Sequence, residues 1–379
     1  TLTDDQSAAY QQIVNGKETN YLLKGVTGSG KTRLHAGRAA EAIERGKSVN
    51  VLTPEIGLTT PLVSYFETAF GKDAVTCFHS QLSVKDKAKA WAEVAKAKLP
   101  QIVIGPRSAL FLPVNNLGLL VIDEAHDSAY KQEQQPFYTA TRVAAKLATL
   151  AGAKCILGSA TPLVADYYAF ASKKLPVITL PQTAIQSQYT RKDTVVDLRD
   201  RSVFDRSQLI STPLLQAIEQ AIKHKQQVLL YLNRRGSART VLCQNCGWQK
   251  LCPRCDIALT YHADQNNVLC HSCGFQESVP LQCPTCSSAD IIFQTPGTKS
   301  SEAEVARLFP YARIARFDKD SVAGAKLHQS FDDINSGKID VLIGTQLLAK
   351  GLDLPRLSVI GLIQADSSMA IPDFSAAEK

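Results

Sequence analysis

The stretch YLLKGVTGSGKTRLHAGRAAEAIER, residues 21–45, decides the fold of this chain. It opens with an apolar run at 21–26, passes through the glycine-rich segment GVTGSGKT at 25–32, and ends in an amphipathic segment at 32–45. The glycine-rich segment matches the phosphate-loop pattern G-x-x-x-x-G-K-[ST], which functions between a buried strand and a helix. We therefore expect a strand, a phosphate-binding loop and a helix, in that order.

In such a loop the glycines let backbone N–H groups turn toward phosphates, and the helix N-terminus adds positive potential. Lys31 would reach the β- and γ-phosphates, and the Thr32 hydroxyl would bind magnesium. The expected cofactors are therefore ATP and magnesium. The residues expected to bind them in this loop are Gly25, Gly28, Ser29, Gly30, Lys31 and Thr32.

Outward from the loop, short apolar runs alternate with amphipathic stretches through the first half of the chain. Buried strands are expected at 21–26, 49–53, 74–78, 101–105, 117–123 and 153–158, with helical segments at 32–45, 58–70 and 83–97. Near-continuous apolar strands joined by helices indicate a parallel sheet covered on both faces. The pattern predicts a doubly wound α/β lobe over residues 1–178.

A proline-containing polar stretch at 179–210 breaks this rhythm and is interpreted as a linker. A second α/β lobe is expected to start at 211–239, to be interrupted by a cysteine-rich insertion at 240–292, and to resume at 293–379, where it is truncated. Its expected helices lie at 212–224, 300–308 and 323–336, and its expected strands at 227–232, 312–317, 339–344 and 357–363.

The apolar run LLVIDEAH, 119–126, ends in two carboxylates. Asp123 at the strand tip suits a magnesium ligand, and Glu124 suits the base that orients an attacking water. Together with Lys31 they are the predicted catalytic residues. The alternative is an exposed acidic turn after a core strand, which the neighbouring phosphate loop disfavours.

Eight of the ten cysteines lie between residues 243 and 286 as four Cys-x-x-Cys pairs, enough for two closed zinc sites. The two inner pairs are 14 residues apart, which favours one zinc shared by the inner pairs and another shared by the outer pairs. His262 and His271 are interpreted as surface histidines, and Cys77 and Cys155 as core residues. The expected zinc ligands are Cys243, Cys246, Cys252, Cys255, Cys270, Cys273, Cys283 and Cys286.

The bulk composition narrows the classes of protein. The 379 residues are 45% hydrophobic and 20% charged, as in globular proteins, and contain no apolar run near the ~18 residues of a membrane helix. The net charge of +7 fits a polyanionic partner without demanding one. Clustered thiols favour a reducing cytoplasm. The chain begins without methionine, so we expect a piece of a longer protein.

A DEAH sequence after a phosphate loop resembles superfamily 2 helicases. GSATP (158–162) resembles the motif that couples hydrolysis to domain movement, and GTQLLAKGLDLP (344–355) resembles motif V. TLTDDQSAAY (1–10) resembles a Q-motif, which implies that Gln6 reads adenine.

Further stretches resemble one helicase family specifically. They are PEIGLT (54–59), GPRSALF (105–111), DSAYKQEQQPFY (127–138), LNRRG (232–236) and CGWQKLCPRCD (246–256). Together, over essentially the whole chain, they resemble the primosomal protein N′ family, the PriA replication-restart helicases. The resemblance implies two RecA-like lobes, nested zinc sites and 3′–5′ ATP-dependent unwinding of DNA at stalled forks. It also implies primosome proteins and single-strand-binding protein as partners.

The chain departs from the family pattern in several places. Ala125 replaces a glutamate at a position without chemistry, and Pro106 replaces a threonine. GLDLP replaces a form with histidine and phenylalanine. The family's upstream DNA-binding domains and its arginine-bearing motif VI are not in this sequence. We therefore expect ATP binding with slow hydrolysis, since arginine fingers are worth ~10³–10⁵ in rate.

DNA contacts are expected from the aromatic segment after DEAH, because bases stack on aromatic side chains whatever their sequence. The alternative is that these aromatics cover the core. The expected DNA-binding residues are Arg107, Tyr130, Lys131, Phe137, Tyr138, Arg234, Arg235 and Lys350. The cysteine-rich module holds more acidic than basic side chains, so we expect it to contact protein partners or to split a duplex with Trp248, Tyr261 or Phe275.

Two other functions stay open at this point. An RNA helicase or duplex translocase of the same superfamily would share the motor motifs. A zinc-containing, ATP-binding assembly scaffold with weak catalysis would share the cysteines and the phosphate loop. The leading expectation is a monomeric cytoplasmic DNA helicase that has no membrane partner.

Overall fold

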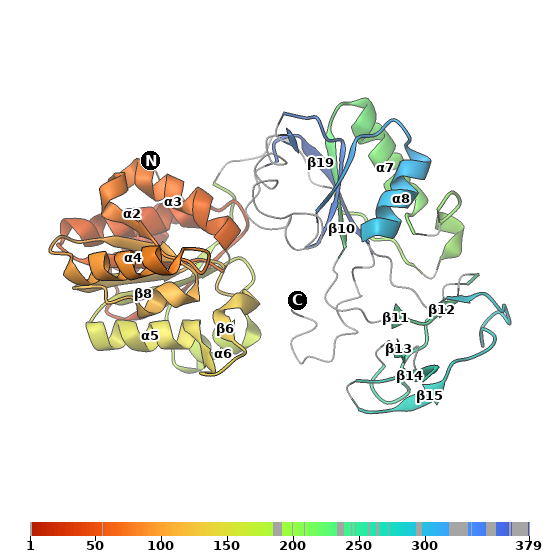
Figure 1. Ribbon diagram of the computed structural model, residues 1–379, viewed down its shortest axis with the longest axis horizontal. Coiled ribbons are helices and arrows are strands. Elements are labelled where there is room, and N and C mark those ends of the chain that lie inside the picture. The colour runs from red at the N-terminus through yellow and green to blue at the C-terminus, as the bar shows by residue number, and fades with distance from the viewer. Residues whose placement is uncertain are drawn as a thin grey trace. The chain divides into compact units, whose positions relative to one another are not determined.

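The computed structural model divides into two compact units, Thr1–Arg191 and Lys192–Lys379, which are described separately (Figure 1). At 56–61, 201, 239–240 and 292 the structure describes the backbone and not the side chains. The described residues are 2–54, 56–184, 192–198, 200–207, 209–232, 239–243, 245–246, 248–256, 258–262, 265–271, 273–292, 298–317, 333–334, 336–345, 354–363, 365 and 378.

The first unit is built on a seven-stranded sheet in the order β3-β4-β2-β5-β8-β1-β9. Every pairing in it is parallel, as the buried apolar runs predict. The strands are β1 (Asn20–Gly25), β2 (Ser48–Leu52), β3 (Val75–Cys77), β4 (Ile102–Gly105), β5 (Leu117–Ile122), β8 (Lys154–Ser159) and β9 (Val177–Leu180).

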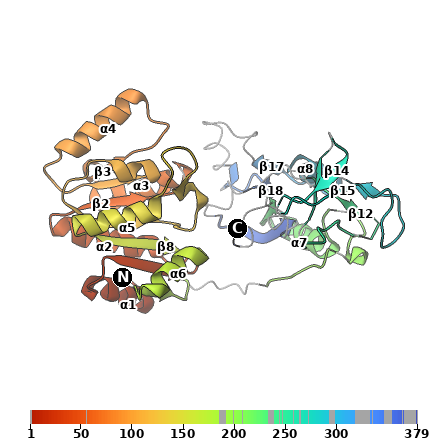
Figure 2. The same cartoon turned by 90° about the horizontal axis from the view of Figure 1, so that it is seen from below.

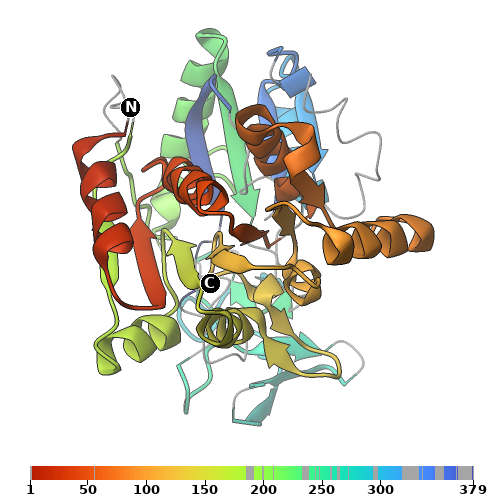
Figure 3. The same ribbon diagram turned by 90° about the vertical axis from the view of Figure 1, so that its left-hand side faces the viewer.

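Successive side chains along each strand enter opposite hydrophobic layers, which fixes which helices cover which face. Leu23 and Val121 pack in one layer with α1, α2 and α3, whereas Leu22 and Ile122 pack in the other with α4, α5 and α6 (Figures 2 and 3). The helices are α1 (Asp4–Asn15), α2 (Lys31–Glu44), α3 (Ile56–Phe70), α4 (Val84–Lys96), α5 (Ala140–Ala151) and α6 (Val164–Ser172).

Local sequence signals set the ends of these helices. A capping box begins α1, in which the Thr3 side chain accepts from the Gln6 N–H and the Gln6 side chain accepts from the Thr3 N–H. Gly152 ends α5 in the left-handed region at φ 64°. Gly30, also left-handed, precedes the first residue of α2. The last two residues of the phosphate-loop segment, Lys31 and Thr32, therefore form the start of α2.

The first unit extends beyond the boundary expected at residue 178. Strand β9 pairs with β1 from Leu22↔Val177 to Gly25↔Leu180, so the expected boundary falls inside a sheet strand. Ala184 N–H also donates to the Gly28 carbonyl at 2.8 Å. The start of the expected linker therefore packs against the phosphate loop instead of leaving the lobe.

The second unit contains a four-stranded parallel sheet in the order β17-β18-β10-β19. Two helices, α7 (Thr212–Lys223) and α8 (Thr298–Leu308), cover one layer of it, which includes the buried Ile210 from the end of the expected linker. The helix expected at 323–336 lies almost wholly outside the described residues. The strands are β10 (Gln227–Leu232), β17 (Ile314–Phe317), β18 (Val341–Gly344) and β19 (Leu357–Ile363).

The cysteine-rich segment forms small antiparallel sheets around its own apolar cluster. One sheet has the order β11-β13-β14-β15, and β12 pairs with β16. Val241, Leu259 and Val268 are each fully buried there beside two cysteines, Cys252 and Cys270. The strands are β11 (Arg239–Thr240), β12 (Leu242–Cys243), β13 (Thr260–His262), β14 (Asn267–Leu269), β15 (Gln276–Ser278) and β16 (Ile291–Ile292).

Candidate nucleotide site and cysteine clusters

The phosphate-loop segment connects the carboxyl end of β1 to α2, as the sequence predicts. Gly28 and Gly30 have φ values of 78° and 76°, a region that disfavours any side chain. A Cβ on Gly25 would lie 2.5 Å from Ser29 Oγ, and one on Gly30 would collide with Gln6 Nε2. The loop is thus wound tightly enough that glycine is required at these positions.

Lys31 is the first residue of α2, and its side chain folds back across the loop. Its Nζ donates to the Gly25 carbonyl at 3.0 Å and lies 4.0 Å from Glu124 Oε1. The residue is only 7% exposed. An ammonium group held over the loop in this way is placed for a phosphate and is already near the acidic motif.

Gln6 supports the loop from α1. It is 1% exposed, its Nε2 donates to the Ser29 carbonyl at 2.8 Å, and its Oε1 accepts from the Thr3 N–H at 3.1 Å. The side-chain amide therefore joins the start of the chain to the phosphate loop. Adenine recognition by this residue stays a prediction.

The two carboxylates follow β5 at the same sheet edge as the phosphate loop. Burial raises the pKa of Asp123, against the opposing effect of Lys31. Burial and then Asp123 raise the pKa of Glu124, while Lys31 and His126 lower it. Glu124 also has φ 47°, an uncommon backbone conformation for a residue with a side chain. These groups are partly buried carboxylates beside a buried lysine, unlike a fully exposed acidic turn.

The acidic motif is joined directly to GSATP. The Ala125 N–H donates to the Gly158 carbonyl at 2.8 Å, and His126 Nδ1 lies 2.9 Å from Ser159 Oγ. The same imidazole nitrogen is 3.5 Å from Glu124 Oε2. Hydrogen bonds and a close imidazole contact therefore link Glu124 and its neighbours to β8.

The structure corrects the assignment of Tyr130 as a base-stacking residue. Its side chain is 2% exposed, and its hydroxyl lies 2.5 Å from the Asp123 carbonyl and 3.0 Å from the Leu52 carbonyl. The ring fills the layer under the sheet, as in the alternative reading of this segment. Its polar end contacts the backbone of the acidic motif.

The other aromatic-segment residues lie nearer the surface. Phe137 is 69% exposed and Lys131 is also exposed, whereas Tyr138 packs edge-on against Phe111 with ring centroids 5.2 Å apart. Arg107 donates to the carbonyls of Ala129 and Lys131 at 2.6 and 2.9 Å. Arg107 thus holds the backbone of this segment. The other expected DNA contacts, Arg234, Arg235 and Lys350, lie outside the described residues.

Sequence reasoning missed His35, four residues after Lys31 on α2. It is 2% exposed, and its Nε2 lies 4.0 Å from Asp123 Oδ1. The i, i+4 spacing from Lys31 was the available signal, because residues so spaced share one face of a helix.

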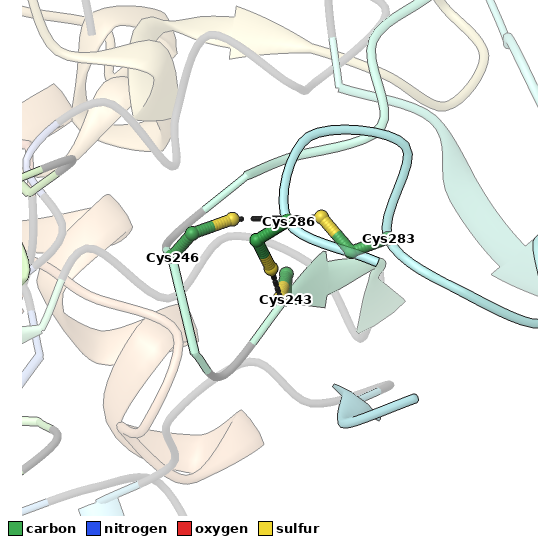
Figure 4. A group of neighbouring side chains, drawn as sticks. All are labelled: Cys243, Cys246, Cys283 and Cys286. Carbon is green, nitrogen blue, oxygen red and sulfur yellow. Dashed lines mark hydrogen bonds between the residues drawn. The ribbon is translucent and has the colours of Figure 1, made fainter. Parts of the chain in front are cut away.

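The outer cysteine pairs meet at one point, with their four sulfurs directed toward each other (Figure 4). Cys243 and Cys286 sulfurs are 3.6 Å apart, and those of Cys246 and Cys283 are 3.5 Å apart. A tetrahedron of Zn–S bonds of ~2.3 Å has sulfurs ~3.8 Å apart, so this group fits a zinc ion.

The inner pairs form a second group. Sulfurs of Cys252, Cys255, Cys270 and Cys273 all lie within 4.8 Å of one another. Cys252 and Cys273 sulfurs are 3.6 Å apart. The expected nested arrangement, inner with inner and outer with outer, is therefore the one that brings the sulfurs together.

Of the remaining cysteines and histidines, Cys155 is buried in β8 and Cys77 is partly exposed in the edge strand β3. His262 and His271 are outside both sulfur groups, and their Nε2 atoms lie 3.2 Å apart. They therefore contact each other at the surface of the module.

The basic and aromatic side chains described in the module contact other parts of it. Lys250 pairs with Glu277 at 2.7 Å, and the Arg254 guanidinium lies 5.7 Å from the Phe275 ring centroid. Trp248, Tyr261 and Phe275 pack against the buried cluster. These three rings therefore pack partly in the module's interior.

Within the described part of the chain, no helix is both long and apolar enough to cross a membrane.

Comparisons with solved structures agree on the fold. RecG bound to a three-way DNA junction superposes with a TM-score of 0.53 at 15% identity, covering 95% of this chain and 38% of that one. The DUF1998 helicase MrfA bound to DNA and AMPPNP gives a TM-score of 0.56 at 14% identity, covering 99% of this chain and 45% of that one. At such identities the likeness shows the RecA-like helicase fold alone.

Comparisons of sequence are more specific. Residues 3–168 match the family model of the DEAD/DEAH box helicases, and residues 252–277 match that of the PriA DNA helicase Cys-rich region. The replication restart protein PriA of Bacillus subtilis is 38% identical over 100% of this chain and 47% of its own length. That of Haemophilus influenzae is 38% identical over 100% of this chain and 51% of its own length.

The chain thus spans about half the length of the curated relatives it matches. Because the identity runs along the whole chain and includes the cysteine-rich region, this chain is similar over its full length to about half of the replication restart protein PriA.

Proposed function

We propose that this chain is the ATP-driven motor portion, with its zinc module, of a DNA helicase that restarts replication at stalled forks. The observation that carries the proposal is the convergence of Lys31, Asp123 and Glu124 at one sheet edge in a chain that is similar over its full length to part of PriA. A lysine for the phosphates, a carboxylate for magnesium and a carboxylate for the attacking water are the groups that nucleotide hydrolysis uses.

The loop residues fit a magnesium–nucleotide complex. Gly25, Gly28 and Gly30 leave a backbone cradle that side chains would fill, and Ser29 Oγ is buried without a hydrogen-bond partner among the described residues. Lys31 would hold the β- and γ-phosphates, and Thr32 with Asp123 would hold magnesium. When bound, the metal neutralises charge on the phosphates.

The residues of the acidic motif have separate parts in hydrolysis. Lys31 lies against the Gly25 carbonyl and 4.0 Å from Glu124 Oε1, so a bound phosphate would draw the ammonium from its present partners. Glu124 would then accept a proton from the attacking water, a task that its raised pKa favours. His126 and Ser159 would carry the resulting shift to the GSATP segment.

The aromatic segment is the proposed contact with single-stranded DNA. Phe137 is exposed enough to stack on a base, and Lys131 is exposed beside it to meet a phosphate. Tyr130 instead links this segment to the acidic motif by a hydrogen bond to the Asp123 carbonyl. Arg107 links it to η2 (Arg107–Phe111) by a hydrogen bond to the Ala129 carbonyl. Strand binding would therefore reach Asp123 through hydrogen-bonded backbone.

The cysteine-rich module would bind two zinc ions as structural sites, since each group already supplies four thiols and leaves no open position. Its two basic side chains between Cys243 and Cys286 are engaged within the module, Lys250 with Glu277 and Arg254 over Phe275, which supports a surface for protein partners over general DNA affinity.

The wider parts of the proposal come from the family resemblance. They are 3′–5′ movement, action on forks and single strands as a cytoplasmic monomer, and recruitment of primosome proteins and single-strand-binding protein.

The test is ATP hydrolysis by the chain with forked DNA, with single-stranded RNA of the same length, and without nucleic acid. We expect slow hydrolysis that DNA stimulates more than RNA does, and its loss in Lys31→Ala. Lys24→Ala, an exposed lysine one strand residue before the loop, is the matched control and should keep the wild-type rate.

Stronger stimulation by RNA would favour an RNA helicase. Nucleotide binding without any stimulated turnover would favour an ATP-binding scaffold, and in that case Lys31→Ala would keep partner recruitment.

A further inference from the structure

His35 is a buried polar side chain that lies beside the phosphate loop and the acidic motif but belongs to neither. Among the described residues, neither Nδ1 nor Nε2 of its imidazole has a hydrogen-bond partner. Leaving such groups buried and unsatisfied costs ~1–3 kcal/mol each. A histidine kept there at this cost needs a partner that is present in another state of the site.

The position of the ring identifies the partner. A Cβ added to Gly158 would lie 2.8 Å from His35 Nε2 and 3.6 Å from the Ile122 carbonyl, so Nε2 faces the join between β5 and β8. The carboxylate of Asp123 is the acceptor at that place, with Oδ1 4.0 Å from Nε2. This separation is too long for a hydrogen bond but short enough to close by a side-chain rotation.

An imidazole donates from Nε2 both in its neutral Nε2–H tautomer and in its protonated form, so the contact with Asp123 requires no particular charge state. Hydrogen bonds in catalytic sites are often long without ligands and shorten when the ligands bind.

We infer that His35 is a positioning residue whose Nε2–H donates to the Asp123 carboxylate once nucleotide and magnesium are bound, and so orients the carboxylate for the metal. This inference rests on the proposed ATP site. Groups that orient metal-binding side chains typically contribute 10–100-fold to metal affinity or activity. The effect should therefore appear only in the part of nucleotide affinity that depends on magnesium.

The test compares two substitutions of similar length and volume. His35→Gln keeps an N–H donor near the Nε2 position, and His35→Met removes it. A fluorescent mant-ATP titration is run with magnesium and with EDTA, and the ratio of the two dissociation constants is the magnesium coupling. His35→Leu is a second donor-free variant, and thermal melts identify any variant that fails to fold.

We expect His35→Met to lower the magnesium coupling about 10-fold while leaving the EDTA dissociation constant unchanged, and His35→Gln to keep it within about threefold. In an Asp123→Ala background, His35→Met should lower the coupling no further, because the two residues act through one contact.

Two results would overturn the inference. One is a coupling in folded His35→Met and His35→Leu equal to wild type. The other is an equal loss in His35→Gln and His35→Met, which would mean that ring shape matters and the N–H does not. If wild-type protein binds no mant-ATP in either buffer, the proposed ATP site itself fails and this inference fails with it.

Discussion

The nested pairing of the cysteines predicts how many zinc ions each cysteine variant retains. In the structure, Cys252 and Cys270 belong to one sulfur group and Cys243 to the other. Removing Cys252 and Cys270 together should destroy one site and leave the other with all four thiols. Removing Cys243 and Cys252 together should instead damage both sites.

The magnitude follows from the number of thiols left. A complete four-thiol structural site binds zinc with an apparent ~10–16 kcal/mol, comparable to the ~5–15 kcal/mol stability of a whole domain. An intact site therefore holds its ion against a chelator of micromolar affinity, which corresponds to ~8 kcal/mol. A site that has lost one or two of its four thiols should lose that competition.

The assay is zinc content by elemental analysis after dialysis against such a chelator. Wild type should retain two ions, Cys252→Ala/Cys270→Ala one, and Cys243→Ala/Cys252→Ala none. Cys77→Ala/Cys155→Ala is the matched control, because both lie outside the sulfur groups, and it should retain two.

The opposite result would refute the geometry. If the first two pairs along the chain shared one ion, Cys243→Ala/Cys252→Ala would retain one zinc and Cys252→Ala/Cys270→Ala none. Unchanged mant-ATP binding in every variant would show that the first unit is intact and that any loss is local to the module.

Three further results are expected from the described contacts. Gly30→Ala should lower the unfolding free energy more than Gly46→Ala, because both have positive φ (76° and 71°) but only the first would place its Cβ against another side chain; equal losses in urea melts would contradict the close approach. Tyr130→Phe should destabilise the protein by ~1 kcal/mol through its lost hydrogen bond, whereas Phe137→Ala should leave the melting temperature unchanged and weaken single-strand binding by ~1–3 kcal/mol; the reverse pattern would restore the base-stacking role of the tyrosine. The hydrogen bond from Arg313 lowers the pKa of Asp340, so its stabilisation is present above the unfolded pKa and lost as pH falls through the folded pKa. Asp340→Asn should therefore lower the melting temperature at neutral pH, and this difference should shrink as the pH falls through the folded pKa; a difference that does not change with pH would contradict the ion pair.

Much of the nucleotide site is readable in the sequence because its determinants are local. The phosphate loop needs glycines at fixed offsets, and the acidic motif needs two carboxylates directly after an apolar strand, so both are contained in short stretches. Their meeting at one sheet edge follows from the parallel strands, since the carboxyl ends of such strands share an edge.

The sequence is a poorer guide to which side chains of the aromatic segment are buried. Tyr130 and Phe137 lie in one aromatic-rich segment, yet one is 2% exposed and the other 69%. Arg107 is of a residue type that commonly contacts phosphates, yet its guanidinium donates hydrogen bonds to two backbone carbonyls. Which side chain turns inward depends on the space left under the sheet by α5 and η2, and no local pattern records that space.

The sequence by itself determined the two α/β lobes, the phosphate loop with its acidic partner, and the eight thiols of the insertion. These depend on residue type and spacing, which act over a few residues. Only the tertiary structure decided that β9 belongs to the first sheet, that Tyr130 is buried under the acidic motif, and that His35 faces Asp123. Strand β9 pairs with β1, the Tyr130 hydroxyl bonds to Leu52, and His35 faces Asp123. Each of these contacts joins residues distant in sequence, and packing alone brings them together.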